Sequence, residues 1–160
     1  MNARDVLYYG HGTVLRAIDG LPRDKWVEPG VVGYWSVKNI ISHLASFEMF
    51  LNELLDALPQ GGSMPIIERL VADPQRFNDV EVDQKRADQS PADAWDEYVT
   101  GWETSMRLLD EIPEAERRVT GALPWYGEEY DLEDFLAYTF YGHKREHCAQ
   151  IMVYRDKLNL

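Results

Sequence analysis

Two histidines near the C-terminus have the spacing of metal ligands. His143 and His147 stand four positions apart in the run Gly-His-Lys-Arg-Glu-His-Cys over residues 142–148. Four residues advance an α-helix by about 400°, so both imidazoles lie on one face, roughly 6 Å apart, and can share one cation. Spacing of this kind also occurs in ordinary core or surface histidines with hydrogen bonds to protein groups. A third ligand is therefore needed before a metal site is predicted.

His43 is the candidate for that third ligand. It follows Ile40 by three positions and precedes Phe47 by four, which places it on or beside the apolar face of an expected helix. His143 and His147 also fall on the apolar face of their own helix, so all three rings are expected to point into the protein. Three protein ligands with open coordination positions are typical of a catalytic metal site, whereas four protein ligands are typical of a structural site. Neutral imidazoles suit zinc, nickel, copper and iron alike.

Four further side chains are candidates for a substrate pocket beside the metal. Trp125 and Tyr126 lie in a connector ahead of the histidine-bearing helix, where large aromatic rings can roof a cavity or simply pack. Glu48 stands five residues after His43, well off its face, and is either a general base or a packing residue. Glu146 precedes His147 and is either a support for the metal ligands or an exposed acid.

The elements that must position these residues are four amphipathic helices. Apolar side chains recur at three- and four-residue steps in four segments, and no segment alternates like a strand. Ser36, Ser90 followed by Pro91, and Asp131 are capping signals for the second, third and fourth helices. The pattern predicts an all-α four-helix bundle in one domain over residues 1–160, with one short extra helix in the irregular connection 63–89. The four helices are expected over residues 3–18, 36–58, 90–112 and 131–157.

Composition limits the class of protein. The 160 residues match one domain, and 45% apolar residues can fill its core. The net charge of −12 repels phosphate backbones and anionic lipids, so neither nucleic acid nor a membrane is an expected partner. The N-terminus lacks the pattern of a signal peptide, and the lone Cys148 cannot form an internal disulfide. A cytoplasmic protein is expected, with Cys148 as a buried inert thiol and His11 as a core histidine.

Three runs of sequence carry a resemblance to a known family. They are Gly-Tyr-Trp-Ser-Val-Lys-Asn-Ile-Ile-Ser-His-Leu over residues 33–44, the pair Phe77-Asn78, and His-Lys-Arg-Glu-His-Cys-Ala-Gln-Ile over residues 143–151. Together they resemble the DinB-like family of metalloenzymes over about residues 3–157. The resemblance implies a four-helix bundle, often dimeric, that holds zinc or nickel through one histidine of the second helix and two of the fourth. Those positions correspond to His43, His143 and His147.

The resemblance also implies a range of activities. Relatives in this family include mycothiol-dependent maleylpyruvate isomerase, bacillithiol S-transferase and hydrolases that confer self-resistance to small molecules. A metal-dependent enzyme that acts on a small electrophile is therefore expected, either as an S-transferase with a low-molecular-weight thiol or as a hydrolase. The ion is expected to be zinc or nickel, with iron as a further option. Two alternatives stay open: a non-catalytic bundle that binds or sequesters a small molecule, and an interaction bundle whose histidines merely pack.

Overall fold

The computed structural model describes residues 2–160, and the second, third and fourth helical rods begin at the predicted caps, whereas the cap of the first was not predicted. Helix α1 (Ala3–Ile18) is capped by Asn2, whose side chain accepts from the backbone of Arg4 and Asp5. Helices α2 (Val37–Ala57) and α5 (Pro91–Glu111) open with capping boxes made by Ser36 and Ser90. Since such caps satisfy backbone N–H groups that have no partner inside the helix, they fix where each helix starts.

The fourth helix differs from the uninterrupted α-helix that the sequence predicts. It opens with a capping box at Asp131 and runs through α7 (Leu132–Phe135), a π-helical segment η3 (Leu136–Tyr141) and α8 (Gly142–Lys157). A π-turn adds a residue to the turn and rotates everything that follows relative to a regular α-helix. Here the turn ends directly before the two histidines of α8.

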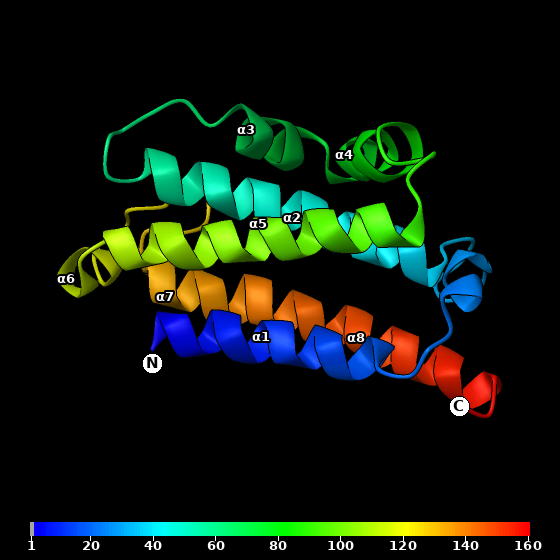
Figure 1. The fold of residues 1–160 in the computed structure, drawn as a ribbon. Coiled ribbons are helices and arrows are strands. Elements are labelled where there is room, and N and C mark those ends of the chain that lie inside the picture. The colour runs from blue at the N-terminus through cyan, green and yellow to red at the C-terminus, as the bar shows by residue number, and fades with distance from the viewer. Residues whose placement is uncertain (1) are drawn as a thin grey trace.

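Four helical rods form two packed layers. Figure 1 shows α2 beside α5 in one layer and α1 beside the α7–η3–α8 rod in the other. Helices α3 (Pro65–Ala72) and α4 (Pro74–Asn78) lie outside α2, and α6 (Glu114–Arg117) lies at the end of α5. A 3₁₀ turn, η1 (Arg23–Val27), connects α1 to α2 and buries Trp26. Apart from an isolated bridge between Val32 and Trp35, the described residues contain no β-structure. The predicted four-helix bundle is confirmed.

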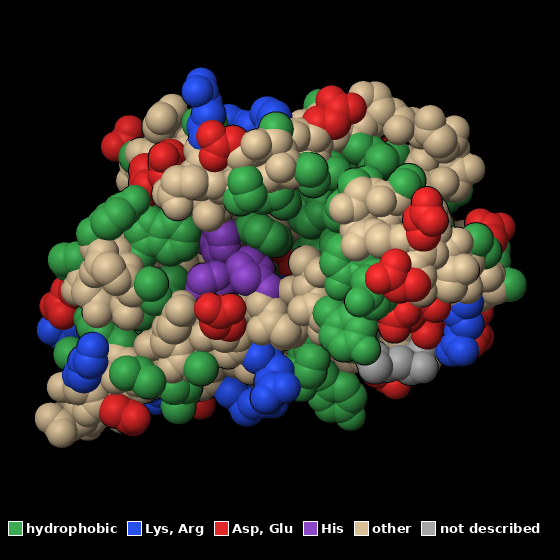
Figure 2. Space-filling view, turned by 180° about the vertical axis from the view of Figure 1, so that it is seen from behind, with side chains coloured by type: hydrophobic (Ala, Val, Ile, Leu, Met, Phe, Trp, Pro, Cys, Tyr) green, Lys and Arg blue, Asp and Glu red, His purple; other side chains and the backbone are tan. Residues whose placement is uncertain are grey.

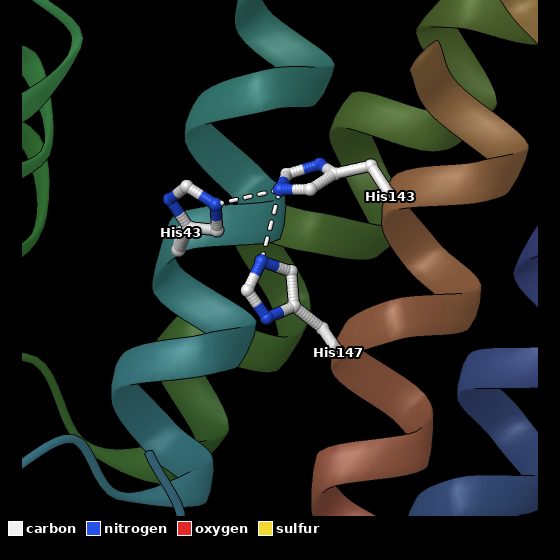
Figure 3. Close-up of side chains that lie close together, drawn as sticks. All are labelled: His43, His143 and His147. Atoms are coloured by element: carbon white, nitrogen blue, oxygen red, sulfur yellow. Dashed lines mark hydrogen bonds between the residues drawn. The ribbon is translucent and has the colours of Figure 1, made fainter. Parts of the chain in front are cut away.

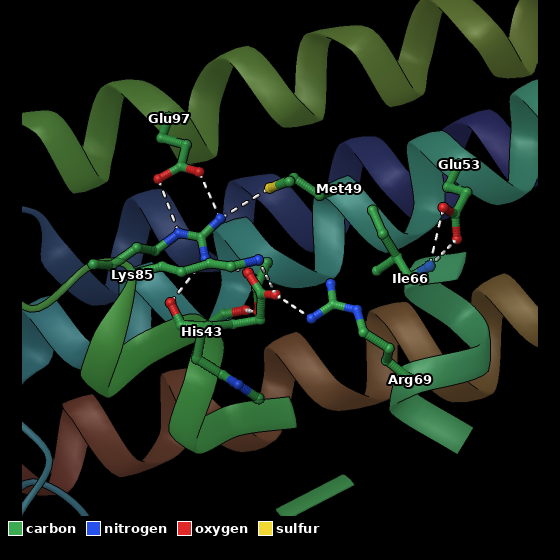
Figure 4. Close-up of polar contacts among 10 residues, drawn as sticks. His43, Met49, Glu53, Ile66, Arg69, Lys85 and Glu97 are labelled. Carbon is green, nitrogen blue, oxygen red and sulfur yellow. Dashed lines mark hydrogen bonds and ion pairs between the residues drawn. The ribbon is translucent and has the colours of Figure 1, made fainter. Parts of the chain in front are cut away.

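The connection 63–89 is more ordered than the sequence predicts. The expected short helix is present as α3, but the following stretch, expected to be irregular, forms α4 and a π-helical turn η2 (Asp79–Gln84). A buried ion-pair network holds it: the carboxylate of Glu81, only 2% exposed, pairs with Arg69, Lys85 and Arg86. Arg86 reaches on to Glu97 of α5 at 2.6 Å (Figure 4). Ion pairs, which leave no hydrophobic periodicity in the sequence, fix this segment.

The hydrophobic core is divided into two clusters along the bundle axis. One cluster surrounds Leu7, Leu54 and Phe135, and the other surrounds Val14, Ile40 and Ile151. Between them each rod contributes polar or small residues, among them Gly10, His43, Glu48, Gly101, Ser105, His143 and Lys144. We call this band the polar layer. Within residues 2–160, no helix combines the length and apolar character needed to cross a membrane.

Candidate metal centre

The three predicted histidines come together between the two layers of the bundle. His43 lies in the second turn of α2, and His143 and His147 lie in the first two turns of α8. In Figure 3 the three rings point toward one another across the gap between these helices. His43 is almost fully buried, whereas His143 and His147 are partly exposed. Residues 100 positions apart thus share one site, as their placement on two apolar helix faces predicts.

The Nε2 atoms of the triad converge closely enough for a single ion. The Nε2 atom of His143 lies 2.9 Å from that of His43 and 2.9 Å from that of His147. Two ligand nitrogens at roughly 2.0–2.1 Å from one metal lie no more than about 4.2 Å apart, so this spacing is compatible. A ring nitrogen carries either one proton or one lone pair, so His143 Nε2 cannot form both contacts as good hydrogen bonds. A cation between the three nitrogens removes that conflict.

The outer nitrogens of two rings face side-chain amides. His147 Nδ1 lies 2.8 Å from Oε1 of Gln150, which favours the tautomer with a proton on Nδ1 and a lone pair on Nε2. The Nδ1 atom of His43 and the Oδ1 atom of Asn78 are both buried, and neither has a regular hydrogen-bond partner in the described part of the chain. Asn78 nevertheless raises the pKa of His43, which places its side chain beside the ring. Both amides suit ligands that bind through Nε2.

All three rings are neutral at physiological pH. Burial, with the nearby His147 and Lys144, lowers the pKa of His143 to about 3. Burial and repulsion from the other two imidazoles hold the pKa of His43 well below its ordinary value. Burial also lowers the pKa of His147, although Gln150 and Glu146 act in the opposite direction. Since a metal binds the unprotonated nitrogen, protons compete little for the site near neutrality.

Aromatic side chains line the triad. The ring centroid of Phe47 lies 4.7 Å from His43 and 4.3 Å from His143, and that of Trp35 lies 5.2 Å from His43. Figure 2 shows a cluster of histidine side chains at the floor of a hollow, with hydrophobic side chains beside it. Trp35 was not among the residues predicted for the site. Phe47 stands one turn after His43, and that spacing was the available signal for its place in the site.

The predicted acidic pocket residues have different surroundings. Glu48 is fully buried, forms an ion pair with Lys144 and accepts a 2.7 Å hydrogen bond from Ser105. Its carboxylate is therefore engaged inside the core, in agreement with the packing alternative. Glu146 is exposed and raises the pKa of His147, so it lies at the rim of the triad.

Trp125 and Tyr126 are half-buried farther along the bundle. Trp125 packs against Phe50 at 6.0 Å and Phe135 at 5.3 Å, and Tyr126 packs against Phe135 at 4.9 Å. Among the described residues, neither ring contacts a histidine of the triad. Phe50 packs against Phe47 at 6.0 Å, so aromatic rings form a continuous path from Trp125 to the triad. A role for Trp125 and Tyr126 in a pocket stays a prediction.

The two remaining candidates lie outside the centre. His11 stacks on Trp102 at 3.9 Å, and its Nδ1 lies 3.2 Å from the hydroxyl of Tyr98, as expected for a core histidine. Cys148 is buried, and burial raises the pKa of its thiol to about 12. A thiol with that pKa is protonated and unreactive at neutral pH.

Comparison with known proteins gives one match. The family model of the DinB superfamily matches residues 7–151, which include all three histidines of the triad. No curated protein and no solved structure matches the chain. The match covers most of the sequence and agrees with the helical fold and with the resemblance carried by residues 33–44 and 143–151. The chain therefore belongs to the DinB superfamily.

Proposed function

We propose that this protein is a divalent-metal-dependent enzyme whose ion is held by His43, His143 and His147. The observation that carries the proposal is the convergence of three neutral Nε2 atoms, two pairs of which are 2.9 Å apart, at a partly exposed site. Three neutral ligands leave positions open for a substrate and keep the full charge of the ion. Zinc or nickel is the proposed metal, and iron is also compatible with three imidazoles.

The proposed reaction is thiol-dependent transfer or hydrolysis on a small electrophile. A divalent cation at this site supplies positive charge that lowers the pKa of a thiol or water and so provides a nucleophile at neutral pH. In S-transfer the thiol sulfur bonds to the electrophilic carbon, the leaving group departs with its electron pair, and the thiol proton passes to solvent. Trp35 and Phe47 present apolar surface beside the triad, which favours an uncharged or apolar electrophile.

The partners and the location of the protein are also proposed. A net charge of −12 supports a small-molecule substrate over nucleic acid or a lipid surface, and the single cysteine supports a cytoplasmic location.

A homodimer is proposed because aromatic residues on α1 and η3 are exposed, with Tyr9 at 60% and Tyr138 at 64%. Exposed aromatic groups of this kind are common at protein interfaces. Light scattering on the purified protein measures the oligomeric state directly.

Turnover before and after metal removal tests the proposed function. The purified protein is assayed with glutathione, bacillithiol or mycothiol and a panel of small electrophiles, then stripped with a chelator and reloaded with zinc or nickel. We expect activity to disappear on chelation, to return with metal, and to be lost in His143→Ala. His11→Gln is the matched control, since His11 is a buried histidine outside the triad. Equal rates with and without metal would contradict the proposal.

A non-catalytic binding bundle is the second candidate. It is supported by the engagement of Glu48 with Lys144, which leaves no buried carboxylate free to act as a base among the predicted site residues. A binding protein would retain an apolar ligand after chelation and would show no turnover with any thiol. Equilibrium binding of the electrophile panel to the metal-free protein separates the two functions.

A further inference from the structure

The polar layer contains a buried ion pair that the proposed chemistry does not use. Glu48 of α2 has no exposed surface, and Lys144 of α8 is 2% exposed. They pair with each other, and the second carboxylate oxygen of Glu48 accepts a hydrogen bond of 2.7 Å from Ser105 of α5. The pair therefore connects the two layers of the bundle at its centre.

Two glycines make room for this pair. A Cβ atom at Gly101 of α5 would lie 2.7 Å from the Cβ atom of Glu48, a distance that side chains do not tolerate. A Cβ atom at Gly10 of α1 would lie 3.3 Å from the Cδ atom of Lys144. All four rods thus approach one another around the pair. Helices α1 and α5 come close because each has a glycine there, and α2 and α8 carry the two charged side chains.

The pair lies next to the triad in sequence and connects the same two helices. Lys144 directly follows His143 on α8, and Glu48 follows His43 by five residues on α2. On α8, the offset of one residue turns Lys144 by about 100° from His143. On α2, the offset of five residues turns Glu48 by about 140° from His43, so on both helices the charged side chain points in a different direction from the histidine. The charge of Lys144 also contributes to the lowered pKa of both His143 and His11.

A buried ion pair is a poor source of stability. Desolvating two charges offsets most of their attraction, and replacing both partners with apolar side chains of similar volume is often neutral or stabilising. A pair in the core is better suited to fixing one arrangement of helices against alternatives, because a shifted arrangement would leave both charges without partners. The alignment that this pair fixes is that of α2 against α8, the two helices that carry the metal ligands.

We propose that Glu48 and Lys144 are positioning residues, a charged clamp that sets α2 against α8 so that His43 meets His143 and His147 at metal-binding distance. The inference rests on the proposed metal site. In this role Glu48 does not contact the substrate and acts by positioning the metal ligands. The same role accounts for two charged side chains at a place where apolar side chains would fill the core. Without the clamp, the helices still pack, but the three Nε2 atoms no longer converge in one arrangement.

The test separates folding from metal affinity. The zinc affinity of the metal-free protein is measured by competition with a chromophoric chelator, and stability is measured by urea unfolding without metal. For Glu48→Leu/Lys144→Met we expect a urea midpoint equal to or above that of the native chain and a zinc Kd raised about 10- to 100-fold, as for loss of groups that orient metal ligands. Arg107→Gln/Glu111→Gln, which removes an exposed pair of α5, is the charge-matched control and should leave the zinc Kd unchanged.

The zinc affinities of the native chain and of the double variant test the clamp and the metal site separately. A folded double variant with native zinc affinity overturns the clamp, whereas a native chain that binds no zinc or nickel overturns the proposed function instead. Should the double variant fail to fold, Glu48→Gln keeps the shape of the side chain and removes only its charge, and it should also weaken zinc binding. Unfolding of both variants without metal would show that the pair is needed for the fold itself, which also overturns the positioning role.

Discussion

Acid should destabilise the metal-free protein through its buried histidines. The pKa of His143 is about 3 and that of His11 about 4 in the folded chain, against roughly 6.5 in an unfolded one. The unfolded state therefore binds more protons below pH 6.5, and stability must fall as the pH drops from there toward the folded pKa values. Burial is the main cause of both pKa shifts, so the loss of stability in acid arises from histidines inside the core.

The size of the loss follows from these values. Between pH 7 and pH 5, linkage gives about 2 kcal/mol of lost stability for His143 and about 2 kcal/mol for His11. The lowered pKa values of His43 and His147 add to the loss in the same direction. Carboxylates contribute little in this window: Glu81, with a pKa of about 2, accounts for about 0.2 kcal/mol at pH 5. A total of at least about 4 kcal/mol is a large part of the stability of a typical domain.

Urea unfolding in the presence of a chelator, at pH 7, 6 and 5, measures this loss. His143→Asn should remove about 2 kcal/mol or more of the pH dependence, because it also relieves repulsion on His43. His11→Gln should remove a similar amount without touching the triad. An unfolding free energy that stays constant from pH 7 to pH 5 would refute the claim that these rings are buried and neutral.

Three further results are expected. Zinc or nickel at 100 times its Kd should stabilise the native chain by about 2.7 kcal/mol in urea unfolding, whereas an unchanged midpoint would mean that no native site exists. Gln150→Leu should raise the zinc Kd about 10- to 100-fold by releasing Nδ1 of His147, and an unaltered Kd in a competition titration would exclude that orienting role. Gly101→Ala should destabilise the fold by about 1–3 kcal/mol because the new methyl group meets Glu48, and a thermal midpoint at or above the native value would contradict the close approach of α2 and α5.

Helix starts and the inward direction of each histidine were within reach of the sequence because both are local signals. Ser36, Ser90 and Asp131 each cap a helix by bonding to a residue three positions ahead, and that pattern is visible in the chain itself. The placement of the three histidines on apolar faces predicted that they would point inward. Their convergence is confirmed, whereas the metal itself stays a proposal.

The features that the sequence did not predict depend on polar pairings that hydrophobic periodicity does not reveal. The ordered segment after α3 is held by Glu81, which pairs with Arg69 twelve residues earlier and with the neighbouring Lys85 and Arg86. The cap at Asp73 ahead of Pro74 was an available signal for α4. Lys144 gave no sign of burial, because a lysine is normally exposed and only its pairing with Glu48 keeps it in the core.

The π-helical turn before His143 was also beyond the sequence. The apolar positions of residues 131–157 predict one regular α-helix, and nothing in their spacing marks the π-turn that changes the direction of the later side chains. The π-turn ends at Tyr141, two residues before the first ligand of α8. This local departure from the regular helix therefore contributes to the direction in which His143 and His147 point.

Elemental analysis of the purified native protein, beside the variant with His43, His143 and His147 all changed to Ala, measures directly whether the metal centre exists. We expect about one equivalent of a divalent transition metal per chain in the native protein, or full uptake of one equivalent on equilibration with zinc or nickel, and none in the variant. A native protein that neither contains nor binds such an ion, or a variant that retains it, would contradict the metal centre.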